Sequence, residues 1–447
     1  MMRQKIRLAL VVAAAAAVTL SGCSTGGNTT TPSSSAPSST APAAPSGEIS
    51  FAFWGGQQRV DRTQAVIDLY MKAFPAVKVT PTATGDFNAY WQQLTVQAAG
   101  NNMPCVPQTQ NRTMADYGDR GALLALDDLV ASGQIDVTNL PDSVVNSGRG
   151  ADGKLYMIPY GAAFTSLMVD TTVIKDLGLP LPPAGYTWEW LSNWLGQIKD
   201  KTGKPAINVF GDVSDELEVW SRAHGENLYG QGGTLGLTAA NVAAYWNYVM
   251  DLMNTGKSQT AQDRVEQQSL PIEQQPISQG VVPVMFWPAN AVATVQKTLD
   301  SITPGHTIEL FPVPADSKGV PGNALYLSGL SISKNCNNVT AAASFINFFL
   351  NDKDGALAFK SDNGVTTNKV NLQALLADAN ISPAMKQQMN LYNTLSGMNL
   401  PPSHYGKNMS QVFQINLQQA FQAVAFGQVT VEAGAAQYIA DSKAILG

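Results

Sequence analysis

The chain has 447 residues, of which 45% are hydrophobic and only 13% are charged, and its formal net charge at pH 7 is −6. This acidic, sparsely charged composition excludes nucleic acid as a main partner, because nucleic acid requires a basic surface. The spacing of the three cysteines and three histidines fits no zinc site, and the sequence has neither a glycine-rich phosphate loop nor a Gly-x-Ser-x-Gly elbow. We therefore expect no enzymatic activity, no metal and no cofactor.

The first 23 residues have the pattern of an export signal. Basic residues within the first seven positions precede an uncharged apolar run at residues 8–20, which is too short to span a membrane comfortably. The run ends in Leu-Ser-Gly-Cys at Cys23, which resembles a lipobox, whose cysteine is lipid-modified and becomes the first mature residue. We expect a lipoprotein, with a plain secretory signal as the alternative.

Residues 24–47 form an expected tether. They are Ser, Thr, Pro, Ala and Gly with one Asn, and such a segment buries too little surface to offset its ordering entropy. We expect it to be disordered, with an extended reach of roughly 75–85 Å. A lipid with two or more acyl chains on Cys23 would then hold the folded body stably at the outer face of the cytoplasmic membrane.

The rest of the chain is long enough for two lobes, because one hydrophobic core seldom organises so many residues. Its first part alternates strands and helices. We expect strands at 48–53, 77–80 and 105–109 and helices at 61–74 and 90–99. This alternation predicts an α/β fold with a largely parallel sheet, in which ligands bind at the carboxyl ends of strands. Trp54, Asp86-Phe87 and Asn111-Arg112 would lie on that edge.

A second series of alternating elements begins near residue 156. We expect strands at 167–169, 281–286 and 325–333, and helices starting after Thr187 and at 215–224, 239–254, 291–299 and 339–350. The C-terminal third is expected to be helical, with an amphipathic segment at 409–426. Trp188, Trp190, Trp194 and Trp246 fall on apolar helical faces and are expected in the core.

Four stretches share an order and spacing with a known family. They are residues 98–104 with 117–123, residues 152–160, residues 187–190, and residues 280–287 followed by 327–333 and 366–368. Together they resemble the carbohydrate-type extracellular solute-binding proteins of ABC importers, the broad group that includes maltose-binding protein. The chain departs from that pattern at Cys105, where the family usually has Asp, and at Val169-Asp170-Thr171, where it commonly has Tyr-Asn-Lys.

The resemblance implies a two-lobed periplasmic-binding-protein-like fold, in which two α/β lobes are joined by a three-segment hinge. It places the crossings near residues 160–165, 324–328 and 366–369. Lobe 1 would comprise 48–160 and 327–366, and lobe 2 would comprise 164–324 and 369–447. In this fold the third strand and the strand at 325–333 are adjacent and antiparallel. Cys105 and Cys336 would then meet in a disulfide, and two unpaired thiols are the alternative.

Sugars offer apolar C–H faces and many hydroxyls, so a sugar site needs aromatic platforms and planar hydrogen-bonding groups. The aromatic candidates at strand ends and crossings are Trp54, Phe164, Trp220, Trp287, Tyr326 and Tyr405. The polar candidates are Asp86, Asn111, Arg112 and Asn290. Each has a structural alternative, such as core packing for an aromatic ring, a helix N-cap for Asn290 or a solvated surface position for Arg112.

The resemblance implies a membrane-anchored extracellular component of an ABC importer. It would be a monomer that captures a mono- or oligosaccharide between its lobes and delivers it to the permease. One alternative keeps the fold and changes the solute to a glycerophosphodiester or a polyamine. Further alternatives are a purely structural surface lipoprotein and an exported carbohydrate-active enzyme. The acidic residues Asp215, Glu216 and Glu218 argue little for an enzyme, because they begin a predicted helix where acidic residues are common.

Overall fold

The computed structural model describes residues 44–447 except 151, 399, 401–402 and 404. The expected export signal, Cys23 and nearly all of the expected tether lie outside the described residues. No helix in the described part of the chain is both long and apolar enough to cross a membrane.

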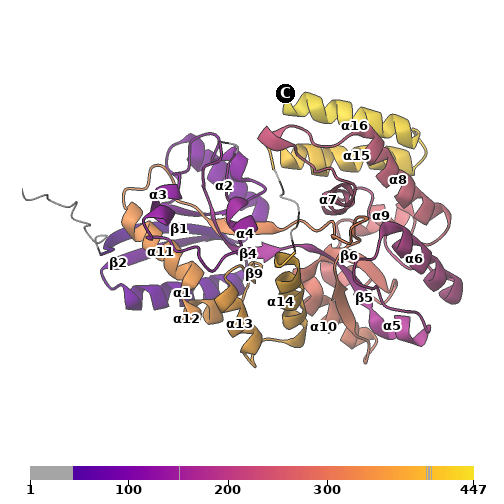
Figure 1. The fold of residues 1–447 in the computed structure, drawn as a ribbon, viewed down its shortest axis with the longest axis horizontal. Coiled ribbons are helices and arrows are strands. Elements are labelled where there is room, and N and C mark those ends of the chain that lie inside the picture. Colours follow the sequence, from indigo (N-terminus) through magenta and orange to yellow (C-terminus); the bar gives the residue numbers. More distant parts are fainter. Residues whose placement is uncertain (1–43, 151, 399, 401–402, 404) are drawn as a thin grey trace, which may run out of the picture. The chain divides into compact units, whose positions relative to one another are not determined.

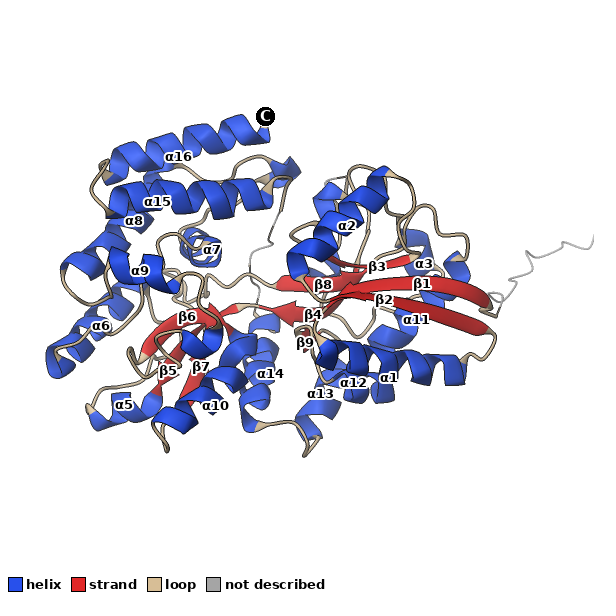
Figure 2. Ribbon diagram, turned by 180° about the vertical axis from the view of Figure 1, so that it is seen from behind, coloured by secondary structure: helices blue, strands red, loops and turns tan. Residues whose placement is uncertain are grey.

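Figures 1 and 2 show the strands and helices, which are numbered in chain order. The strands are β1 (Gly47–Trp54), β2 (Val77–Thr84), β3 (Val106–Gln110), β4 (Ile158–Ala163), β5 (Thr165–Asp170), β6 (Val284–Pro288), β7 (Ile308–Phe311), β8 (Tyr326–Leu330) and β9 (Val365–Thr366). The helices before β6 are α1 (Gln57–Ala73), α2 (Phe87–Ala99), α3 (Asp127–Ala131), α4 (Asp142–Asn146), α5 (Thr171–Asp176), α6 (Trp188–Thr202), α7 (Ser214–Ala223), α8 (Ala239–Asn254) and α9 (Ala261–Gln267). Those after β6 are α10 (Val292–Ile302), α11 (Val339–Asn351), α12 (Lys353–Phe359), α13 (Lys369–Ala377), α14 (Pro383–Ser396), α15 (Leu417–Ala425) and α16 (Val431–Leu446).

The first sheet has the order β2-β1-β3-β8-β4-β9. β1 is parallel to β2 and to β3, as the alternation of strands and helices predicts. Helix α2 covers one face, and α1 and α11 cover the other (Figure 2). The expectation of a largely parallel sheet is wrong beyond β3, because β8 is antiparallel to both β3 and β4, and β4 is antiparallel to β9. Strand β4 leads to the second sheet and β8 returns from it, so neither arises from a strand–helix–strand crossover. Strand β9 follows β8 through α11 and α12.

The second sheet, β6-β5-β7, is entirely antiparallel. Its central strand β5 follows β4 after a single intervening residue, Phe164, so the chain passes directly from one sheet to the other. The sheet packs in a second core that contains Leu167, Val169 and Phe286 together with side chains of α6 and α8. As predicted, Trp188, Trp194 and Trp246 are buried there, and the partly buried Trp190 stacks on Trp194 with ring centroids 5.5 Å apart.

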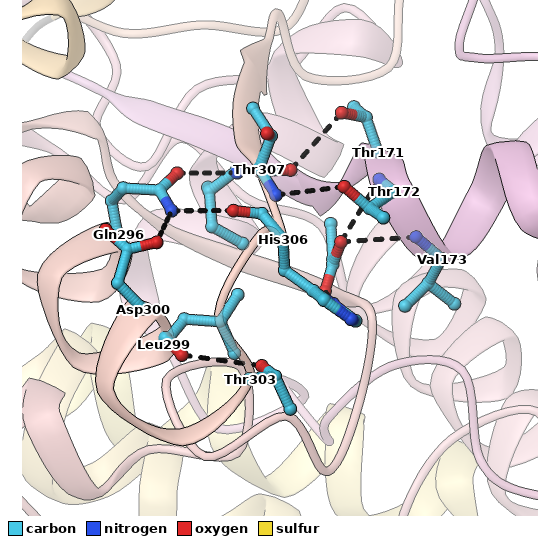
Figure 3. A network of polar contacts seen from close by, with 11 residues as sticks. Thr171, Thr172, Val173, Gln296, Leu299, Asp300, Thr303, His306 and Thr307 are labelled. Atoms are coloured by element: carbon cyan, nitrogen blue, oxygen red, sulfur yellow. Dashed lines mark hydrogen bonds and ion pairs between the residues drawn. The ribbon is translucent and has the colours of Figure 1, made fainter.

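A polar network fixes the end of β5, where the chain departs from the family pattern (Figure 3). Asp170 caps α5 by accepting hydrogen bonds from the backbone N–H groups of Thr172 and Val173. The other Asp170 carboxylate oxygen lies 2.6 Å from His306 Nδ1, and the Thr307 N–H donates to Thr172 Oγ1. Residues 169–171 therefore have a structural role: they join β5 and α5 to the loop before β7.

Helices α13 and α14 connect the two sheets. Leu372, Tyr392 and Leu395 belong to the first core, which surrounds the six-stranded sheet. On the same helix pair, Gln387 Nε2 donates to the backbone oxygen of Ile308 at the start of β7. The family resemblance implies that residues 369–447 belong to the second lobe, and the residue limits of both lobes remain predictions.

The pairing of β3 with β8 carries the disulfide that the family resemblance implies. Gln108 lies opposite Leu330, and the Ser333 N–H donates to the Cys105 carbonyl. Cys105, just before β3, thereby meets Cys336, just after β8, with their Cα atoms 4.5 Å apart. The bond links positions 231 residues apart, so it closes a very long loop of the unfolded chain.

Removing this bond is expected to lower the free energy of unfolding. For the double variant Cys105→Ala/Cys336→Ala we expect a loss of about 2–5 kcal/mol, because the unfolded chain regains the entropy of the open loop. Chemical denaturation of the oxidised protein measures the difference. A reducing agent should destabilise the wild type and leave the double variant unchanged. Mass spectrometry that finds both residues as free thiols in the wild type would contradict the expectation.

Candidate ligand-binding cleft

A cavity of about 420 Å³ lies between segments that belong to the first and the second core. On the side of the first sheet its lining is Asn111, Met114, Ala115, Ser143, Asn146, Ser147, Arg149, Gly150, Leu325 and Leu327. On the side of the second core its lining is Arg222, Gly232, Gly233, Ser403 and Tyr405. The end of α14 and the residues after it add Leu395, Ser396, Met398 and Leu400. The described lining thus combines aliphatic side chains, hydroxyls, amides and two arginines.

Asn111 fixes one wall of the cavity at the end of β3. Its backbone N–H donates to the Leu327 carbonyl, and its side-chain Nδ2 donates to the Leu325 carbonyl. Its Oδ1 in turn accepts from the Leu327 N–H, at 3.0 Å. Because these three bonds hold the end of β3 against the start of β8, the next residue, Arg112, has a defined position.

Arg112 links the two sides of the cleft. Its Nη2 lies 2.7 Å from Asp215 Oδ1 at the start of α7, whose apolar side chains pack in the second core. The guanidinium carbon also lies 3.3 Å from the centre of the Tyr326 ring, a cation–π geometry. Burial is the largest single effect and lowers the pKa of Arg112. The Asp215 carboxylate, together with Tyr326, Tyr405 and Glu218, outweighs burial and raises that pKa well above its ordinary value.

One face of α7 presents Asp215, Glu218 and Arg222, which are spaced three and four residues apart and therefore lie side by side. Glu218 accepts a hydrogen bond from the Tyr405 hydroxyl at 2.9 Å. Arg222 donates to the Asn323 carbonyl, to Asn227 Oδ1 and to Ser403 Oγ. Burial raises the pKa of Glu218, and the charges of Arg222 and Arg112 oppose that shift.

The predicted site residues fall into two groups. The structure brings four of them together at or beside the cavity: Asn111, Arg112, Tyr326 and Tyr405. None of the other six lines the cavity among the described residues, so their part in ligand binding stays a prediction.

Two aromatic candidates are packed in the cores. Phe164 is fully buried and stacks on Tyr392, with ring centroids 6.4 Å apart. Trp220 lies on α7 beside His224, and its indole N–H donates to Asn241 Oδ1 at 2.9 Å. Both rings therefore contribute to packing in this structure.

The remaining four candidates lie at strand ends elsewhere. Trp54 is buried against Phe87 and Trp91, and Asp86 caps α2 by accepting from the Ala89 N–H at 2.7 Å. Trp287 is partly buried against a small cluster formed by β5, β6 and α10, and Asn290 is exposed in the turn after β6. Asp86 thus has the capping role that any carboxylate before a helix can take.

The sequence reasoning missed several residues at the cleft. Three of them could have been found from the sequence. The spacing of Asp215, Glu218 and Arg222 places both acids and the base on one face of a predicted helix. Ser143, Asn146 and Ser147 could not have been found in this way, since polar residues on a short helix are typical of any exposed surface.

Comparison with known proteins identifies the family. Residues 56–356 match the family described as bacterial extracellular solute-binding protein. The chain belongs to this family. Among solved structures, a family 1 extracellular solute-binding protein from Alicyclobacillus acidocaldarius is 24% identical, with a TM-score of 0.75, and the match covers 91% of this chain and 100% of that one.

Two further structures of solute-binding proteins share the fold. The GacH receptor of Streptomyces glaucescens is 18% identical with a TM-score of 0.69, covering 90% of this chain and 98% of that chain. A periplasmic oligogalacturonide-binding protein from Yersinia enterocolitica is also 18% identical, with a TM-score of 0.74 and coverage of 89% and 98%. The expected two-lobed α/β fold of periplasmic binding proteins is confirmed.

A buried glutamate near the cleft generates a pH-dependent expectation for this solute-binding protein. Glu216 on α7 is only 3% exposed, and its Oε2 has no hydrogen-bond partner among the described residues. Burial, aided by the nearby Asp215 charge, raises the pKa of Glu216 well above its ordinary value. The folded protein therefore binds this proton more tightly than the unfolded chain, and stability is lost as pH rises above the ordinary value of 4.5.

We expect Glu216→Gln to be more stable than the wild type at pH 7–8, with the difference shrinking toward pH 4. The amide stays neutral, so the variant avoids the cost of charging a buried carboxyl. Thermal unfolding across that pH range measures the effect, and Glu266→Gln, at an exposed glutamate on α9, is the control. Equal pH dependence in Glu216→Gln and the wild type would contradict the expectation.

Proposed function

We propose that this solute-binding protein captures a saccharide in the cavity between its two cores and delivers it to the permease of an ABC importer. The observation that carries the proposal is the cavity itself, with walls from segments of both cores and a lining that suits a sugar. Met114, Leu327 and Leu395 offer apolar contacts for C–H faces, while hydroxyl and amide side chains such as Ser143 and Asn146 match sugar hydroxyls.

Aromatic stacking has a smaller part in this proposal than the sequence suggested. Among the described lining residues Tyr405 is the one aromatic side chain. Solved relatives have carbohydrate ligands: the GacH receptor binds acarbose, and a Listeria monocytogenes substrate-binding protein is in complex with cycloalternan. These ligands belong to those proteins, and they support a saccharide as the class of solute here.

The proposed mechanism is capture by closure. A solute in the cavity would contact residues of both lobes, and its binding would therefore favour the closed arrangement over the open one. Arg112 and Asp215, which already meet across the cleft, would stay paired in that arrangement. No bond of the solute is made or broken, and ATP hydrolysis belongs to other subunits of the importer.

A polyamine fits the cleft less well than a saccharide. A polyamine site needs several carboxylates facing the ligand, and the described lining residues include no Asp or Glu. A saccharide needs no carboxylate in its site.

Filling the cavity is expected to weaken capture. For Ser143→Trp, which places an indole at an exposed lining position on α4, we expect affinity for the best-bound saccharide to fall at least tenfold. A thermal-shift screen of mono-, di- and oligosaccharides first finds that ligand, since a ligand at 100 times its Kd adds about 2.7 kcal/mol of stability. Isothermal titration then compares the variants.

Ser301→Trp, at an exposed position on α10, is the matched control for the bulky substitution. Unchanged affinity in a folded Ser143→Trp variant would place the ligand elsewhere. Failure of every saccharide to bind, with a response to a glycerophosphodiester instead, would keep the fold and replace the proposed solute.

We further propose that a lipid on Cys23 anchors the protein outside the cell. In a bacterium that processes lipoproteins, the wild type should fractionate with the membrane and the Cys23→Ser variant with the soluble material. Ser24→Ala is the neighbouring control. Cys23→Ser protein that remains membrane-bound would contradict the lipid anchor.

A further inference from the structure

Two arginines at the cavity are paired with carboxylates. Arg149 lines the cavity, and its Nη1 lies 2.7 Å from Asp127 Oδ1. Arg112 stands beside the cavity with its Nη2 2.7 Å from Asp215 Oδ1. Neither guanidinium offers an uncompensated charge to a ligand.

The third arginine is held by neutral acceptors near a buried glutamate. Arg222 donates to Asn227 Oδ1 and Ser403 Oγ. Burial raises the pKa of the nearby Glu218 carboxyl, and the charges of Arg222 and Arg112 oppose that shift. Glu218 is only 1% exposed and accepts from the Tyr405 hydroxyl. The three arginines at the cleft are thus already engaged, Arg149 and Arg112 by carboxylates and Arg222 by neutral oxygen atoms.

An anionic ligand would have to compete with the carboxylates that already pair with Arg112 and Arg149. A carboxylate that reached for Arg112 would compete with Asp215, and either anion left without its cation would be desolvated and unpaired. The Tyr326 ring covers one face of the Arg112 guanidinium, and this cation–π contact further stabilises the cation beside Asp215.

Two polar atoms of this cluster remain unpaired beside the cavity rather than in its lining. Arg112 Nε and the Tyr326 hydroxyl are buried and have no hydrogen-bond partner among the described residues. A sugar hydroxyl that came within reach could satisfy such groups without adding charge, because it both donates and accepts.

We propose that the cleft selects uncharged saccharides against uronic acids, and that Asp215 enforces this selection by occupying Arg112. The inference rests on the proposed function, because it presumes that the solute is a saccharide. It separates this chain from its structural relative in Yersinia enterocolitica, which is described as an oligogalacturonide-binding protein.

The test is isothermal titration of the full chain with matched ligands: neutral di- and trisaccharides and their uronic acid counterparts. We expect the wild type to bind the neutral member of a pair at least 100-fold more tightly than the acidic member. Affinity for the neutral ligand should not change between low and high salt, because no net charge is brought together. In Asp215→Asn, where Arg112 is released, the neutral-to-acidic ratio should fall at least tenfold.

Asp251→Asn is the matched control, since it removes a carboxylate that pairs with Lys257 on the surface near the end of α8. Equal or tighter binding of the acidic member by the wild type would overturn the inference and leave the proposed function standing. An unchanged ratio in a folded Asp215→Asn variant would overturn the role of Asp215. If that variant does not fold, the wild-type ratio alone decides the selection. Absence of binding to any saccharide would overturn the proposed function and this inference together.

Discussion

The antiparallel pairing of β3 with β8 is the constraint on which the rest of the structure depends. It joins residues more than 200 positions apart, with Gln108 opposite Leu330 and Gln110 opposite Ser328. At one end of the pair the strands bring Cys105 to Cys336. At the other end they bring Asn111 and Arg112 against the segment that enters β8, where the cavity begins. One ladder of backbone hydrogen bonds thus positions both a covalent link and a wall of the cleft.

The electrostatics of the cleft follow from that placement. An arginine held at a strand end next to a second core loses water and needs a carboxylate partner, which α7 supplies as Asp215. The same helix turns Glu218 and Arg222 to the same side while its Leu217 and Val219 enter the core. A single amphipathic helix therefore provides packing for one lobe and charges for the space between lobes.

Much of the fold could be predicted from the sequence, because local patterns are set by neighbours along the chain. The apolar spacing that buries Trp194 and Trp246 is helical, and it predicted α6 and α8 correctly. The site was harder to predict, because an aromatic ring at the end of a strand can either contact a ligand or pack against another side chain of the protein. Phe87 and Trp91 bury Trp54, and sequence spacing does not reveal such contacts between elements. From the sequence, Asp215 is an ordinary acidic residue at the start of a helix. Its pairing with Arg112 depends on where the fold places the end of β3.

The disulfide also determines how the molecule would bear mechanical load. A protein pulled by its two ends carries tension along its chain. The bond between Cys105 and Cys336 offers that tension a covalent shortcut, so the backbone enclosed between them, including every strand of the second sheet, is not stretched while the bond is intact. Under such force β1, β2 and the C-terminal helices would yield first. Because Leu417, Phe421 and Tyr438 of α15 and α16 belong to the second core, the enclosed part would lose packing while its backbone stayed unstretched.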